Sequence, residues 1–129
     1  MTFTATQALK DAQLSGGIDG ALDDDPTDPA YAILFDAGDV ALVTLLFAKP
    51  AASLVAHALV FAQGDLTGDF ILNQGSATDF ELYSGTGILL GTGDVSDMAG
   101  TGALKVSGTT GTLLYAGARA ILGELKFEI

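Results

Sequence analysis

The chain contains one histidine, His57, and no cysteine, so any nucleophilic site that needs a histidine base has to be built around this residue. A serine nucleophile is usually found on a Gly-x-Ser-x-Gly turn, with such a base nearby. The sequence has no turn of this kind, and Ser53 and Ser84 lie in ordinary strand contexts. His57 is flanked by two alanines in an apolar run, which favours a packed or edge-strand histidine over a catalytic base.

Acidic residues and prolines crowd the segment 23–29, which could supply oxygen ligands to a calcium ion. Its carboxylates are Asp23, Asp24, Asp25 and Asp28. An EF-hand loop needs glycine at its sixth position and a bidentate acid at its twelfth. Counted from Asp23, those positions hold Asp28 and Leu34. The segment therefore predicts a solvated loop or linker, and no metal site is assigned.

Two further patterns match enzyme sites only in part. Asp79 and Glu81 could be the paired carboxylates of a glycosidase, but both would lie on one strand face pointing away from the core, and the chain has no tryptophan to stack on a sugar. The pairs in Gly85-Thr86-Gly87 and Gly91-Thr92-Gly93 lack the third glycine and the following helix of a nucleotide-binding loop. We therefore predict no enzyme activity, and assign no catalytic, cofactor-binding or metal-ligating residue.

The composition is strongly acidic, with 16 acidic residues, 5 basic ones and a net charge of −11. The basic residues are scattered, at Lys10, Lys49, Lys105, Arg119 and Lys126. Such a charge repels phosphate backbones and anionic lipid headgroups, so neither nucleic acid nor membrane is predicted as a partner. The runs without charged residues fall short of the ~20 residues that span a membrane, and no secretory signal is evident. These features predict a soluble protein made in the cytoplasm.

The order of predicted elements indicates an all-β domain after a different N-terminal part. Good helix formers over residues 5–14 predict a short helix or a flexible arm, which Ser15-Gly16-Gly17 ends. Short apolar runs divided by glycines then predict strands at 31–36, 40–47, 53–61, 69–73, 78–84, 88–90, 103–107, 112–115 and 120–129. Lys49-Pro50 is expected to end the second of these, and Gly91 to Asp94 to form a turn.

The last predicted strand has the clearest pattern, because Leu125, Phe127 and Ile129 alternate with charged residues. Seven or more strands at roughly ten-residue spacing predict an antiparallel β-sandwich or barrel. The predicted organisation is an N-terminal helix or arm with an acidic loop over residues 1–30, followed by one β domain over residues 31–129.

The sequence of segments resembles a family of small virion proteins of tailed bacteriophages. The resemblance is carried by the run 45–50 (LLFAKP), the approach 76–85 (SATDFELYSG), the turn Gly93-Asp94-Val95, the strand 102–106 (GALKV) and the turn 115–118 (YAGA). It implies a capsid decoration, or cement, protein that stabilises the capsid by binding across subunits of the major capsid protein. It also implies location in the virion and a homo-oligomer, with a trimer favoured.

Residues 1–30 are expected to reach onto a neighbouring subunit, because they are acidic, broken by glycine and poorly suited to the core. A tail or neck component of the virion is the nearest alternative. A carbohydrate- or receptor-binding module is a third, and it would use exposed aromatic residues such as Tyr31, Tyr83 and Tyr115.

Overall fold

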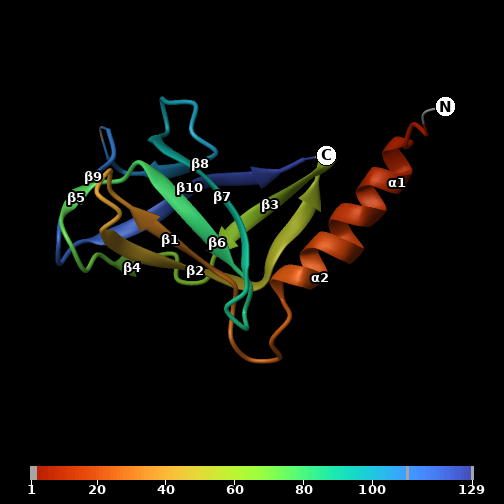
Figure 1. The fold of residues 1–129 in the computed structure, drawn as a ribbon, viewed down its shortest axis with the longest axis horizontal. Helices are drawn as coiled ribbons and strands as arrows, with labels where there is room; N and C mark the ends of the chain where they lie inside the picture. Colours follow the sequence, from red (N-terminus) through yellow and green to blue (C-terminus); the bar gives the residue numbers. More distant parts are fainter. Residues whose placement is uncertain (1–2, 110, 129) are drawn as a thin grey trace.

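The computed structural model describes residues 3–109 and 111–128, and its strands close into a barrel (Figure 1). The strands are β1 (Tyr31–Phe35), β2 (Ala41–Val55), β3 (Ala58–Gln63), β4 (Asp69–Phe70), β5 (Gly75–Ser76), β6 (Asp79–Tyr83), β7 (Leu89–Asp97), β8 (Leu104–Ser107), β9 (Leu113–Leu114) and β10 (Arg119–Phe127). Seven of them follow the order β3-β2-β1-β6-β7-β8-β10, and β10 pairs back onto β3. The predicted all-β class is confirmed, and of its two alternatives the structure is a barrel.

Most neighbouring strands in the barrel are antiparallel, and β7 and β8 form its parallel pair. β4 adds to β10 at one end, while β5 and β9 make a separate two-stranded sheet. Closure pairs strand edges that an open sheet would leave exposed to other chains. β8 pairs with β7 only at Val95, Ser96 and Asp97. The described strands therefore leave the earlier part of β7 without a partner on that side.

The N-terminal helix is longer than predicted and runs past the expected stop at Ser15-Gly16-Gly17. It consists of α1 (Gln7–Ala12), a π-helical segment η1 (Gln13–Ile18) and α2 (Asp19–Leu22). Thr6 caps its start by accepting the N–H of Leu9. Each glycine costs a helix about 1 kcal/mol, whereas burying a leucine stabilises by about 1.5–3 kcal/mol. The helix therefore continues through the glycines because its leucines are buried.

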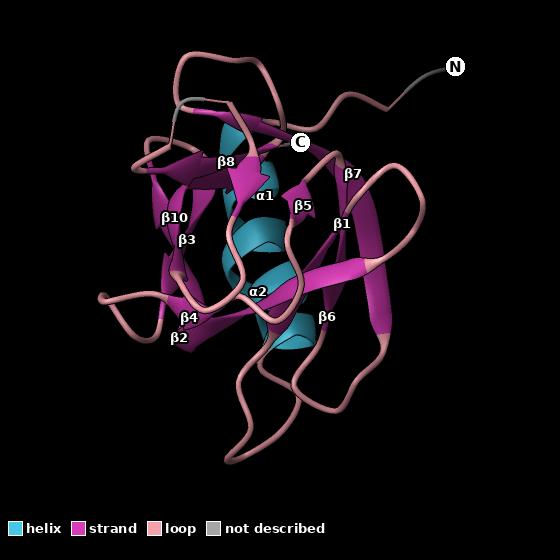
Figure 2. Ribbon diagram, turned by 90° about the vertical axis from the view of Figure 1, so that its left-hand side faces the viewer, coloured by secondary structure: helices cyan, strands magenta, loops and turns pink. Residues whose placement is uncertain are grey.

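This helix lies across one end of the barrel, as Figure 1 shows from the side and Figure 2 from the far end of the barrel. Leu14, Leu22 and Ala30 are completely or almost completely buried in the same core as the strands. The expectation that residues 1–30 are poorly suited to the core is therefore wrong for these side chains. Removing the segment would expose the core, so a deletion cannot test binding while the fold stays intact.

β2 does not end at Lys49-Pro50 but continues to Val55. Its register against β3 shifts between Phe47 and Ala52, which places the proline in a bulge. A bulge is one of the few places in a sheet where proline is tolerated, because no ladder hydrogen bond is lost there. The predicted strand end is therefore wrong, and β2 is long enough to run the length of the barrel.

β7 passes straight through the glycine-rich segment that was predicted to be a turn. A side chain at Gly93 would come within 2.7 Å of the Phe80 ring. Glycine at this position thus makes room for a buried phenylalanine on the neighbouring strand, rather than allowing a tight turn. In β10, Leu125 is buried and Lys126 is exposed, as the predicted alternation requires. Phe127, which was predicted to share the buried face with Leu125, is instead 43% exposed, and Ile129 lies outside the described residues.

Within the part of the chain that the structure describes, no helix is long and apolar enough to cross a membrane.

Candidate binding surfaces

The aspartate-rich segment is a largely exposed loop, as predicted, but hydrogen bonds tie it to the barrel, so it is not a free linker. Asp24 accepts hydrogen bonds from the backbone N–H of Thr86 at 2.8 Å and from its hydroxyl at 2.6 Å. Asp25 accepts the backbone N–H groups of Thr27 at 2.8 Å and Asp28 at 2.7 Å. The carboxylates therefore hold the loop in shape and tie it to the turn after β6.

Asp23 also faces the barrel, where it accepts the N–H of Ala51 at 3.2 Å and lies 3.8 Å from the Lys49 ammonium. Carboxylates engaged in this way have fewer oxygens to offer a cation. Among residues 3–109 and 111–128, no group of three acidic, histidine or cysteine side chains is arranged to hold a metal ion.

Acidification should weaken the docking of this loop. The hydrogen bond from the Thr86 side chain is the main cause of an Asp24 pKa below its ordinary value of 3.8. A carboxyl with a lowered folded-state pKa contributes stability that is present above the unfolded value and is lost as the pH falls through the folded value. We expect Asp24→Asn to lower the thermal midpoint at pH 7 and to reduce the stability lost on going from pH 5 to pH 3.

The matched control is Asp39→Asn, which removes the same charge from an exposed turn and keeps a residue type that tolerates the positive φ of 63° found there. Thermal unfolding followed by circular dichroism at several pH values would measure both variants. Equal pH profiles for the two variants would show that docking of Asp24 does not contribute to stability.

His57 lies in a hairpin turn and not within a strand, so the predicted strand 53–61 is wrong. The chain reverses at Ala56 and His57, which have φ angles of 49° and 68°, and Val55 pairs with Ala58. Nδ1 of His57 lies 2.9 Å from a carboxylate oxygen of Asp11 in α1. Hydrogen bonds from Gln7 first, and then from His57, lower the pKa of Asp11. The pair joins the helix to the tip of the β2–β3 hairpin.

The structure gives no hydrogen bond between His57 and either candidate serine among the residues it describes. Ser84 is fully buried, and its hydroxyl oxygen accepts the N–H of Ile88 at 3.1 Å, which shapes the turn between β6 and β7. Ser53 is exposed near the end of β2. The histidine is hydrogen-bonded to Asp11.

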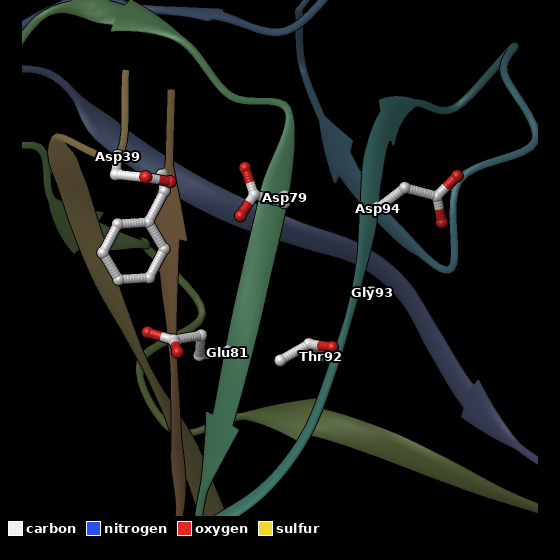
Figure 3. Close-up of a pocket in the computed structure, with 7 residues that line it drawn as sticks. Asp39, Asp79, Glu81, Thr92, Gly93 and Asp94 are labelled. Atoms are coloured by element: carbon white, nitrogen blue, oxygen red, sulfur yellow. The ribbon is translucent and has the colours of Figure 1, made fainter. Parts of the chain in front are cut away.

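An acidic groove of about 560 Å³ runs over the outer face of β6 and β7 (Figure 3). The residues that line it are Phe35, Asp39, Asp79, Glu81, Thr92, Gly93 and Asp94. Asp79 and Glu81 lie on one strand face away from the core, as predicted. Three of the carboxylates already accept hydrogen bonds: Asp79 from the Thr78 hydroxyl at 2.7 Å, Asp94 from the N–H of Ala103 at 2.9 Å and Glu81 from the Tyr83 hydroxyl at 3.1 Å. The groove attracts positive charge and repels anions.

Exposed apolar side chains gather at the end of the barrel away from the helix, and we call this set the loop-end patch. It consists of Phe70, Leu72, Leu113, Tyr115 and Ile121, which are 56%, 70%, 38%, 56% and 38% exposed. Leu113, Tyr115 and Ile121 line a depression of about 300 Å³. Arg119 lies 5.8 Å from the ring centre of Phe70, and β4 pairs with β10 beside it. The patch is therefore formed by β4, β9, β10 and the loops between them.

A second apolar surface, which we call the β7–β10 cleft, opens where β7 has no partner on its β10 side. It contains two adjoining hollows of about 180 and 270 Å³. Its principal side chains are Phe61, Phe80, Leu82, Leu90, Leu125 and Phe127, and Ile18 borders it from the helix. Among the lining residues whose side chains the structure describes, Lys126 is the charged one.

Neither surface was predicted from the sequence, although each corresponds to an apolar run in it. In segment 69–73, Phe70, Ile71 and Leu72 are apolar on both strand faces, and in segment 88–90 three apolar residues follow one another. In segment 69–73 the core takes only one of the two apolar faces, so Ile71 is buried while Phe70 and Leu72 stay exposed. Of the tyrosines, Tyr115 is exposed, whereas Tyr31 and Tyr83 are half-buried and stack with ring centres 5.2 Å apart.

No family model matches the chain, and comparison with curated proteins and with solved structures likewise found no significant match, so its function has to be inferred from the sequence pattern and from these surfaces.

Proposed function

We propose that the protein is a structural virion protein that decorates and stabilises a bacteriophage capsid by binding across subunits of the major capsid protein. It acts by binding and not by catalysis. The observation that carries the binding role is the loop-end patch, a set of large apolar side chains on a chain whose composition is otherwise strongly acidic. The virion assignment comes from the resemblance of the sequence to tailed-phage virion proteins.

The partner surface that fits the patch has an apolar centre and a positively charged rim. Large exposed apolar patches are uncommon on isolated soluble proteins and mark interaction surfaces. Aromatic and aliphatic side chains at the centre of such an interface provide most of the affinity. With a net charge of −11, complementary charge on the partner speeds association and fixes orientation. A cement protein that binds only the assembled shell then stabilises that shell by linkage.

The test adds purified protein to particles of the encoding phage that lack it, and measures binding by co-sedimentation. Leu72→Asp and Tyr115→Asp each place a charge in the patch, and we expect each to weaken binding at least ~30-fold, the effect of losing an interface hot spot. Val55→Asp is the matched control, because Val55 is 54% exposed at the end of β2, beside the turn whose His57 contacts Asp11 of the helix. Binding by both patch variants at wild-type strength would reject the patch as the contact surface.

The location of the protein decides between head and tail. Labelling of the protein in intact particles should place it over the head, in a copy number that scales with the number of capsid subunits. Labelling confined to the tail or neck would overturn the capsid role and favour the alternative virion component.

A further inference from the structure

The edge of β7 over residues 89–94 is unpaired on the side that faces the β7–β10 cleft. On its other side it pairs with β6, from Leu89 opposite Tyr83 to Asp94 opposite Asp79. β8 is too short to continue along β7, since it has 4 residues against 9, and it then pairs with β10 from Leu104 to Ser107. An exposed edge of this kind is a template for an added strand.

The backbone direction along this edge suits such an addition. Val95 donates its N–H to the carbonyl of Thr78, the residue just before β6. Because backbone groups alternate in direction along an antiparallel strand, Thr92 and Asp94 direct their N–H and C=O groups away from β6 and toward the open side. The Asp94 carboxylate accepts the N–H of Ala103, so the chain at Ala103 lies next to Asp94. The backbone groups of Thr92 are therefore at the centre of the free edge.

The cleft beside this edge has room for one more side chain, at Gly91. Gly91 lines the cleft, and a side chain added there would meet nothing within 4 Å. The next inward-facing glycine differs, because a side chain at Gly93 would strike the Phe80 ring. The cleft therefore offers an apolar space next to unpaired backbone, which is the combination that an extended strand with an apolar anchor fills.

The chain itself contains a segment with these properties, just before the helix. Residues 2–6 read Thr-Phe-Thr-Ala-Thr, so threonine alternates with apolar residues as in a half-buried strand. Phe3 is 83% exposed, and in Figure 1 the chain before α1 leads away from the barrel. At ~3.3 Å per residue, residues 3–6 extend about 13 Å and the six residues of the free edge about 20 Å, so the segment fits within the length of the edge.

We infer that β7 accepts residues 3–6 of a second copy of this chain as an added strand, with the Phe3 side chain in the β7–β10 cleft beside Gly91. A second copy fits better than a charged partner, because the segment carries no charged side chain and, among the residues whose side chains the structure describes, no carboxylate lines the cleft. The contact joins different surfaces of the two copies, so repetition gives a closed ring or an open chain. This inference does not rest on the proposed role in a capsid.

Sedimentation of the purified protein alone tests the inference. We expect wild-type protein to form oligomers that depend on concentration, and Phe3→Ala and Gly91→Val each to weaken association at least ~30-fold. The Cβ of the new side chain in Gly91→Val has open space around it, and the substitution places a good strand former in a strand, so we expect it to keep the stability of the wild type. Leu72→Asp, in the loop-end patch, is the control and should associate like wild type.

A mixing experiment separates strand addition from other ways of associating. Phe3→Ala keeps an intact cleft and Gly91→Val keeps an intact segment, so an equimolar mixture should form a one-to-one complex that neither variant forms alone. Added NaCl should strengthen self-association, because it screens the repulsion between copies that each carry −11. A wild-type protein that stays monomeric, or variants that associate normally, or a mixture that does not recombine, would each overturn the inference.

Discussion

Leu14→Ala should destabilise the protein by about 2–5 kcal/mol, the usual cost of removing a fully buried leucine side chain from a well-packed core. Leu14 has no exposed surface and belongs to the same core as the strands, although it lies in a helix that precedes the β domain. A loss of this size is a large part of the 5–15 kcal/mol that typically separates folded from unfolded states. Chemical denaturation at pH 7 would measure it.

Leu9→Ala is the matched control, since it makes the same substitution in the same helix at a side chain that is 42% exposed. Its effect should remain within about 0.5 kcal/mol, as is usual for surface positions. If both variants lose the same small amount of stability, the helix contributes little to the core and the end of the barrel is closed in some other way. A large difference would show that residues before the first strand are part of one cooperative unit.

Gly68→Ala should cost about 3 kcal/mol or more, for two separate reasons. Gly68 has a φ of 98°, which an alanine adopts only with strain of about 1–3 kcal/mol. In addition, its Cβ would lie 2.8 Å from the carbonyl oxygen of Ala120, and a clash with backbone cannot be relieved by turning a side chain. Overpacking of this kind adds roughly 1–3 kcal/mol.

Gly117→Ala separates the two costs, because Gly117 has a similar φ of 87° but open space around it. We expect it to lose only the conformational part, so the difference between the two variants measures the clash. Denaturation curves give both values. The result also bears on the proposed contact surface, because the Gly68 carbonyl accepts a hydrogen bond from Arg119 at 2.8 Å and β4 begins at the next residue. Equal losses would mean that β4 and β10 separate easily at this point.

The strands that the sequence predicts best are short runs with clear ends. Residues 31–36, 78–84 and 103–107 correspond closely to β1, β6 and β8. In 78–84 the alternation of charged and apolar residues reflects local geometry that any neighbouring strand would preserve, and in 31–36 the run is apolar and ends at Asp36. The hairpin at His57 was missed because a two-residue turn with positive φ usually contains glycine or asparagine, and here it contains Ala56 and His57. The opposite error occurred at Gly93, where glycine indicated a turn but serves packing against Phe80.

The docking of the aspartate loop could not be predicted, because its partners are distant in the sequence. Asp24 binds Thr86, which lies 62 residues further along the chain, and Asp23 binds Ala51. A run of carboxylates looks alike in sequence whether its oxygens face water or backbone amides. The same limit applied to Leu14 and Leu22, whose burial depends on the shape of the barrel end that they cover.

The sequence by itself determined that the domain is built of β-strands and that the chain is acidic. It contains no Gly-x-Ser-x-Gly turn of the kind that carries a serine nucleophile. These properties depend on local periodicity and on composition. Only the tertiary structure decided that the strands close into a barrel, that the helix covers one end, and that a cleft remains beside β7. The physical reason is that closure depends on the relative lengths and registers of strands far apart in the sequence. Here β8 is shorter than β7, which leaves the edge and the space that the proposed strand addition would use.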